Sequence, residues 1–243
     1  MKITERVTDF VQLSAEQKHL FFQQLWAFDQ QIFPHSKIES LYQFVYDLDA
    51  VSVQVVQYFH KNILVGQNII AILKLKLDKN PIFVVMSRAG FLPEYRRQNL
   101  SLRSAIRVAF QHRLRHPSVP LWFVTTLMQP KIYSLFASRS LNFYPRNGRK
   151  MSSDHLSVLE MVMSRKSQVE KRDEEVFTHY CDIPKVTPDQ LIRLRHKYDT
   201  HHQFFMQHVP DYFDGMGMMC VCQLDLKTIV ETTFNLAIGR KVR

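Results

Sequence analysis

The sequence PIFVVMSRAGFLPEYRRQNLSLRSAIRVAFQHRLR, which runs from Pro81 to Arg115, decides the fold. Ile82 to Met86 is a short apolar run rich in β-branched residues, and such a run predicts a buried strand. Pro93 ends this strand because proline has no N–H to donate to a ladder. From about Leu100 the apolar residues recur at helical spacing, so a helix follows. The stretch therefore predicts a strand, a basic turn and a helix.

The turn between the two elements has the chemistry of an anion site. The start of a helix presents free backbone N–H groups and the positive end of the helix dipole. Arg96 and Arg97 lie in this turn, Asn99 tolerates a positive φ, and Ser101 is a candidate N-cap. The alternative is an ordinary connection with a solvated basic turn. The apolar stripe of the helix is predicted to comprise Leu102, Ile106, Ala109, Phe110 and Leu114.

The segment LPEYRRQNLS, Leu92 to Ser101, resembles the acyl-CoA-binding loop of the GNAT superfamily of acyl-CoA-dependent N-acyltransferases. That motif has a proline, an acidic residue, an aromatic residue and an arginine. The arginine begins the pattern Arg/Gln-x-x-Gly-x-Gly/Ala, which opens a helix. The residues of this chain that match are Pro93, Glu94, Tyr95 and Arg96. Asn99 and Ser101 stand where the two glycines usually stand.

Length and composition set the broad class. The 243 residues suit one large domain or two small ones, and 46% apolar with 22% charged residues is typical of a globular protein. Three cysteines argue against a disulfide framework because one is left over after any pairing. We see no secretory signal and no apolar run long enough for a membrane span. A soluble cytoplasmic protein without a membrane partner is expected.

The net charge of +10 favours anionic ligands. Between Arg88 and Arg115 there are seven arginines and one acidic residue, so the charge is locally concentrated. A polyphosphate cofactor such as coenzyme A fits this charge, and nucleic acid is an alternative that no nucleic-acid-binding motif accompanies. A solubilising helix face is the plain alternative.

The rest of the chain extends the pattern in both directions. Ser14 to Gln17 is a capping box that starts a helix, and Asp78 to Pro81 is a turn signal. The expected helices are 14–33, 38–46, 100–115 and one from Pro130, and the expected strands are 51–55, 69–77, 82–92, 121–126 and an extended segment at 143–145. The prediction is an α/β fold in which an antiparallel meander is followed by a strand, helix and strand paired in parallel.

This order is also the order that the GNAT resemblance implies, over residues 1–150. Residues 151–243 are expected to form an α+β C-terminal extension packed on that acyltransferase domain. In the extension, Asp154 to Glu170 and a segment from Thr187 predict helices, and Met218 to Leu226 predicts a strand. Lys227 to Ile238 is ambiguous between helix and strand.

The resemblance implies roles for particular residues. The backbone of Phe91 and Leu92 would pair with the pantetheine arm of acetyl-CoA or another acyl-CoA. The turn at the helix start would hold the pyrophosphate, through Arg96, Arg97, Gln98, Asn99, Leu100 and Ser101. Tyr133 would be the acid for the departing thiolate, or else a core aromatic. Glu94 would relay the proton of the amine through water, or else pair with Arg96 or Arg97 at the surface.

Two further groups of residues contain side chains that can bind metals. His201 and His202 point about 100° apart on a helix, so together with His208 and Asp211 they make a poor metal site. Cys220 and Cys222 share a strand face without a second pair, and they are expected to be small buried residues. No metal is therefore predicted.

The sequence thus predicts an N-acyltransferase in which an amine attacks the thioester directly. The amine would belong to a small molecule or a peptide. Two alternatives remain open. One is a protein of the same fold that binds or senses acyl-CoA without catalysis. The other is a basic protein that binds nucleic acid or an acidic partner.

Overall fold

The computed structural model describes residues 2–95, 99–181 and 199–242. The chain divides into two compact units, Met1–Leu121 and Trp122–Arg243. The sequence placed a domain boundary at residue 150 instead. The two units are defined by packing within the chain, which does not test where a domain ends. The predicted end of the acyltransferase domain at residue 150 therefore stays a prediction.

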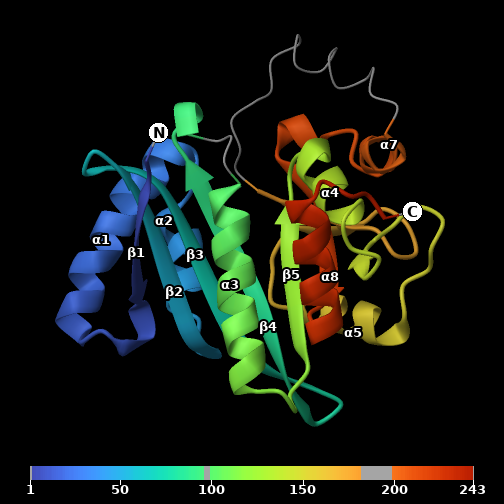
Figure 1. The fold of residues 1–243 in the computed structure, drawn as a ribbon, viewed down its shortest axis with the longest axis horizontal. Coiled ribbons are helices and arrows are strands. Elements are labelled where there is room, and N and C mark those ends of the chain that lie inside the picture. The colour runs from blue at the N-terminus through green and yellow to red at the C-terminus, as the bar shows by residue number, and fades with distance from the viewer. Residues whose placement is uncertain (1, 96–98, 182–198, 243) are drawn as a thin grey trace. The chain divides into compact units, whose positions relative to one another are not determined.

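Apart from its first strand, the first unit contains strands and helices in the predicted order (Figure 1). Its elements are β1 Thr4–Asp9, α1 Ala15–Ile32, α2 Ile38–Val45, β2 Ala50–His60, β3 Ile63–Leu77, β4 Asn80–Phe91 and α3 Leu100–Arg115. Short 3₁₀ turns, Phe10–Gln12 and Pro93–Tyr95, follow β1 and β4. β1 was not predicted, because its residues are mostly polar on both faces and so lack the apolar and polar alternation that indicates a strand. It pairs with β2.

Strands β1 to β4 pair antiparallel in chain order, so the predicted meander is confirmed. The turn from β3 to β4, at Asp78 and Lys79, lies at the predicted place. Lys61 and Asn62 join β2 to β3, and all four residues have positive φ. β3 begins six residues earlier than Ile69, because Ile63 to Asn68 pair with β2 although that segment contains polar residues.

The two faces of this sheet are covered by different helices. The side chain of Gln67 contacts Leu25 of α1, and that of Asn68, the next residue, contacts Ser101 and Ser104 of α3. Because successive side chains in a strand alternate between faces, α1 and α3 lie on opposite faces of β3. Figure 1 shows α3 crossing in front of β3 and β4.

Helix α1 begins as the sequence predicts. The Ser14 hydroxyl accepts from the Gln17 N–H at 3.3 Å, and the Gln17 side chain accepts from the Ser14 N–H at 3.0 Å. Leu25, Phe28 and Ile32 are buried on its inner face. In α2, Leu41 and Val45 are buried, whereas Tyr42 is exposed and stacks on Tyr46.

The buried face of α3 differs from the predicted apolar stripe. The buried residues are Ser104, Val108, Ala109 and His112, whereas Phe110 and Leu114 are exposed. Small residues at 104 and 109 let the helix backbone approach the sheet. Contact with polar sheet residues then fixes the rotation of the helix, which apolar periodicity alone could not reveal.

The second unit has a sheet of its own order. Its elements are β5 Leu121–Leu127, α4 Pro130–Ala137, β6 Phe143–Tyr144, α5 Ser153–Met163, β7 Val169–Lys171, β8 Phe177–Tyr180, α7 Thr200–His208, β9 Met216–Gln223 and α8 Leu226–Ala237. β9 pairs antiparallel with β5, β6 and β8, and β8 pairs with β7. Together with the first unit this gives the mixed α/β fold that the sequence predicted.

Several boundaries in the second unit were mispredicted. Helix α5 ends at Met163 instead of Glu170, because Val169 to Lys171 pair with β8. The ambiguous segment from Lys227 is helical, and the Asp225 carboxylate caps it by accepting from the Thr228 N–H at 2.6 Å. The helix predicted to start at Thr187 lies outside the described residues for most of its length. Among the described residues, no helix has the length and apolar character to cross a membrane.

Candidate functional site

The end of β4 and the start of α3 carry most of the predicted cofactor residues. Phe91 is the last residue of β4 and pairs with Gly66 of β3. Leu92 donates its backbone N–H to the Val65 carbonyl at 3.0 Å, and its carbonyl accepts from the Tyr95 N–H at 2.9 Å. The N–H of Leu92 is thus already paired. Its role toward a pantetheine arm stays a prediction, and it would require this hydrogen bond to break.

The residues that follow form the predicted turn. Glu94 lies exposed in the turn Pro93–Tyr95. Tyr95 is anchored, because its hydroxyl lies 2.9 Å from Nδ1 of His60 at the end of β2. Arg96, Arg97 and Gln98 lie outside the described residues, so their proposed contacts remain predictions.

Asn99 is the N-cap of α3, with φ 50° and ψ 27° in the left-handed region. The expectation that Asn99 adopts positive φ is confirmed. The expectation that Ser101 is the N-cap is wrong, because Ser101 is the second residue of the helix. The Asn99 side chain makes no capping hydrogen bond to the first turn.

A buried polar network lies under this first turn. Asn68 of β3 donates both protons of its side-chain amide, to the Ser101 carbonyl at 2.9 Å and to Ser104 Oγ at 3.0 Å. Tyr58 of β2 places its hydroxyl 2.7 Å from Ser104 Oγ and 3.1 Å from the Leu100 carbonyl, so its one proton is shared between the two. Burial, partly offset by the Ser104 hydrogen bond, raises the pKa of Tyr58 to about 12, so this hydroxyl keeps its proton near neutral pH.

The network reaches one strand further. Ser87 of β4 donates to Asn68 Oδ1 at 2.7 Å, and Ser104 donates to the Ser101 carbonyl at 2.9 Å. Every polar hydrogen of the four side chains therefore has an acceptor. Buried polar groups without partners are costly, and this network leaves none. It joins three strands to the start of α3.

This network was not predicted from the sequence. The available signal was the polar pair Gln67-Asn68 inside the otherwise apolar run Ile63 to Leu73. A polar pair in a central strand has one member on each face, so each helix packed on the sheet meets one amide. Which backbone atoms it meets depends on the docking of the helix.

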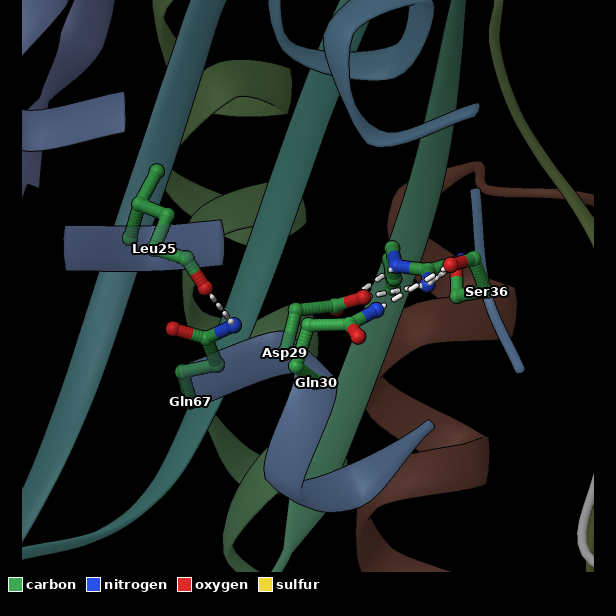
Figure 2. Close-up of polar contacts among 6 residues, drawn as sticks. Leu25, Asp29, Gln30, Ser36 and Gln67 are labelled. Atoms are coloured by element: carbon green, nitrogen blue, oxygen red, sulfur yellow. Dashed lines mark hydrogen bonds and ion pairs between the residues drawn. The ribbon is translucent and has the colours of Figure 1, made fainter. Parts of the chain in front are cut away.

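The opposite face of β4 holds an ion pair (Figure 2). Arg88 donates Nε and Nη2 to the two carboxylate oxygens of Asp29, at 2.9 and 2.6 Å, and Nη2 also donates to Ser36 Oγ at 2.8 Å. The guanidinium carbon lies 4.7 Å from the centre of the Phe33 ring. Asp29 is only 1% exposed, so this pair fastens the end of α1 and the connection to α2 onto β4.

Tyr133, the predicted acid, lies in the second unit on α4. It is fully buried, and its hydroxyl donates to the Pro145 carbonyl at 2.7 Å. Rings of Phe143, Phe204 and Phe205 surround it. Burial raises the pKa of Tyr133 well above its usual value. These contacts are those of a core aromatic, and they weigh against the catalytic role, which stays a prediction.

The cysteines behave as predicted. Cys220 and Cys222 are buried in β9, and burial raises the pKa of both thiols, that of Cys222 to about 12. Their neutral thiols therefore serve as small apolar side chains. Within the described ranges, no three His, Cys, Asp or Glu side chains are grouped so as to hold a metal ion.

No protein-family model matches the sequence, and no curated protein matches it. Solved structures do resemble the chain. One is a conserved protein of unknown function from Enterococcus faecalis V583, described as a probable N-acyltransferase, with 11% identity and a TM-score of 0.37. The match covers 56% of this chain and 33% of that one, so the chain spans about a third of its length.

For two further solved structures, the match covers almost the whole of their own chains. Escherichia coli ElaA has 17% identity and a TM-score of 0.37, over 60% of this chain and 95% of that one. The aminoglycoside N-acetyltransferase AAC(6')-Iy, in complex with CoA, has 11% identity and a TM-score of 0.32, over 71% and 95% of the two chains. Such scores carry no conclusion about activity, which has to be argued from the residues of this chain.

Proposed function

We propose that the protein is an acyl-CoA-dependent N-acyltransferase and that the start of α3 binds the pyrophosphate of the cofactor. The observation that carries this proposal is the position of the motif. Pro93, Glu94 and Tyr95 leave the end of β4, and α3 begins five residues later with Asn99 in the left-handed conformation. Asn99 stands where the motif has its first glycine, and it supplies the positive φ that glycine would provide.

The first turn of α3 suits an anion. The Asn99 side chain does not cap it, so its amides are not occupied by that side chain. The helix dipole adds positive potential at the same end. Arg96 and Arg97 precede this turn in the sequence and would add charge-assisted hydrogen bonds to phosphate oxygens.

The chemistry proposed is direct attack by the amine nitrogen on the thioester carbonyl. The carbon–sulfur bond then breaks, the amine loses a proton, and the CoA thiolate gains one. Alignment of the two reactants supplies much of the rate. Glu94, exposed at the turn, is proposed to relay the proton of the amine through water. The resemblance implies Tyr133 as the acid for the thiolate, but its hydroxyl is buried and donates to the Pro145 carbonyl, so we expect catalysis not to depend on it.

Calorimetric titration with acetyl-CoA and with longer acyl-CoAs tests the proposal. We expect binding by the wild type and at least a tenfold loss in Arg96→Ala/Arg97→Ala, because two phosphate contacts are removed. Lys74→Ala/Lys76→Ala is the matched control: it makes the same change of charge at exposed positions of β3. Equal losses in both variants would point to a nonspecific effect of charge. Absence of binding to every acyl-CoA would refute the proposal.

A protein that binds acyl-CoA without catalysis is the second candidate. The buried Tyr133 hydroxyl, paired with the Pro145 carbonyl, favours it. Turnover against a library of amines separates the two: release of free CoA that depends on an amine identifies an enzyme, whereas binding without release identifies a sensor.

Nucleic-acid binding has less support. Arg88 is paired with Asp29, and Arg107 with Glu5 at 2.7 Å, so two of the seven clustered arginines are neutralised. The cluster therefore offers a weaker field to a phosphate backbone than its sequence indicates.

A further inference from the structure

We propose that Asn68, Tyr58 and Ser104 are positioning residues for the cofactor: from beneath α3 they orient and polarise the first-turn amides that bind the pyrophosphate. This inference rests on the function proposed above and deepens it. None of the three residues belongs to the motif itself. They come from β3, β2 and α3, respectively.

The acceptors in this network are what suggest the role. The sheet side chains bind the carbonyls of Leu100 and Ser101, both in the first turn of α3. A peptide group is planar, so its carbonyl and the N–H of the next residue point in opposite directions. Fixing the Leu100 carbonyl therefore fixes the N–H of Ser101, and fixing the Ser101 carbonyl fixes the N–H of Leu102.

The same hydrogen bonds affect the strength of these amides as donors. A hydrogen bond to a carbonyl draws electron density along the peptide unit and makes its N–H a better donor, since linked hydrogen bonds polarise one another. The Ser101 carbonyl receives two such bonds from side chains, at 2.9 Å from Asn68 and 2.9 Å from Ser104. The opposite ends of these peptide units, the N–H groups of Ser101 and Leu102, then point toward the N-terminus of α3 with enhanced positive potential.

The location of the network also favours this role over simple packing. Its polar side chains gather where the sheet meets the start of α3, whereas residues further along the helix, Val108 and Ala109, are apolar and buried. An apolar interface of the same shape would stabilise a helix at least as well. Hydrogen bonds from the sheet fix the direction of backbone groups as well as the contact, so their placement at the start of α3 favours a positioning role.

The neighbouring residue Gln67 provides a matched control. It lies beside Asn68 in β3, is 2% exposed against 0% for Asn68, and donates its side-chain amide to a helix carbonyl, that of Leu25 in α1. Figure 2 shows this contact on the face away from α3. Asn68→Leu and Gln67→Leu each remove one buried amide from the same strand. Only the first disturbs the start of α3.

The experiment measures acetyl-CoA affinity by calorimetry for the wild type, Asn68→Leu, Tyr58→Phe and Gln67→Leu. Each variant is also unfolded in urea. We expect affinity to fall about five- to tenfold in Asn68→Leu and in Tyr58→Phe, as loss of one aligned hydrogen bond implies, and less than twofold in Gln67→Leu. Tyr58→Phe keeps the buried ring and loses only the hydroxyl, so it remains informative if Asn68→Leu folds poorly.

A second readout does not depend on the cofactor. Backbone amide proton shifts of Ser101 and Leu102 in the free protein should move upfield in Asn68→Leu and Tyr58→Phe and stay unchanged in Gln67→Leu. If the wild type binds acetyl-CoA and the Asn68 and Gln67 variants lose affinity equally, the positioning role is refuted and the proposed function stands. If the wild type binds no acyl-CoA, the proposed function fails and the positioning role fails with it.

Discussion

At the scale of single residues, Asn99 and Tyr133 contribute in different ways. Asn99 holds φ 50° with no hydrogen bond from its side chain to the first turn. Its value to the fold lies in its backbone, because asparagine tolerates the left-handed region better than other residues with a Cβ. Tyr133 is the opposite case, since its hydroxyl has a defined partner.

Asn99→Ala should lower the free energy of unfolding by about 1 kcal/mol, because positive φ is energetically less favourable for alanine than for asparagine. Asn99→Gly should cost less than about 0.5 kcal/mol, since glycine adopts this conformation without strain. Urea unfolding measures both. Equal losses in the two variants would mean that the asparagine amide matters, contrary to this account.

Tyr133→Phe should destabilise the protein by about 1 kcal/mol, the usual net value of a buried hydrogen bond, because the Pro145 carbonyl loses its donor. Since the hydroxyl is buried and paired, we expect turnover with any amine that proves to be a substrate to stay within about threefold of the wild type. A fall of a hundredfold or more, the usual effect of removing a general acid, would instead establish Tyr133 as the acid.

At the scale of elements, Gly66 allows β2, β3 and β4 to share one aromatic contact. The Phe91 ring lies across Gly66 and meets the Tyr58 ring at a centroid distance of 4.9 Å. A Cβ on Gly66 would lie 2.2 Å from Cδ1 of Phe91, closer than atoms can approach. The absence of a side chain at 66 thus places Phe91 against Tyr58, whose hydroxyl belongs to the network under α3.

Gly66→Ala should cost about 1–3 kcal/mol, as overpacking of a core does, because the Phe91 ring must leave its position. The penalty should shrink in the background of Phe91→Leu, whose side chain can move aside more easily. A double-mutant cycle in urea measures this coupling. Additive effects of the two changes would show that the contact does not constrain the strand.

At the scale of the whole molecule, buried histidines link stability to pH. Burial lowers the pKa of His112 to about 4 from its ordinary value of 6.5, with His116 and Arg115 acting in the same direction. Burial also lowers the pKa of His155, His179 and His201. Each of these side chains binds a proton more readily in the unfolded chain, so acid favours unfolding.

The contribution of the unprotonated His112 side chain to the free energy of unfolding is therefore fully present above pH 6.5 and is lost as the pH falls toward 4. By pH 5.5 it should have cost the wild type about 1 kcal/mol of unfolding free energy. His112→Gln should flatten the dependence of stability on pH between 7 and 5.5 by this amount, measured by urea unfolding at several pH values. His35→Gln, at an exposed position, is the control. An unchanged slope in His112→Gln would contradict the burial argument.

Local chemistry determined much of the first unit. The capping box at Ser14 and Gln17, the turn at 78–79 and the helix start near Leu100 were read from the sequence, and the structure has them. These signals work because each is satisfied by residues within a few positions of one another. The burial of Cys220 and Cys222 was also predicted, because the sequence offers no second cysteine pair with which they could form a metal site.

The tertiary structure alone decided what depends on partners far along the chain. β1 exists through pairing with β2, and the rotation of α3 depends on side chains of the sheet, which left Phe110 and Leu114 exposed. The contact between Asn68 and the Ser101 carbonyl joins residues 33 positions apart. The sequence could predict a helix start that suits an anion. It could not predict which buried amide fixes the direction of its N–H groups, because that direction is set by how the helix docks on the sheet.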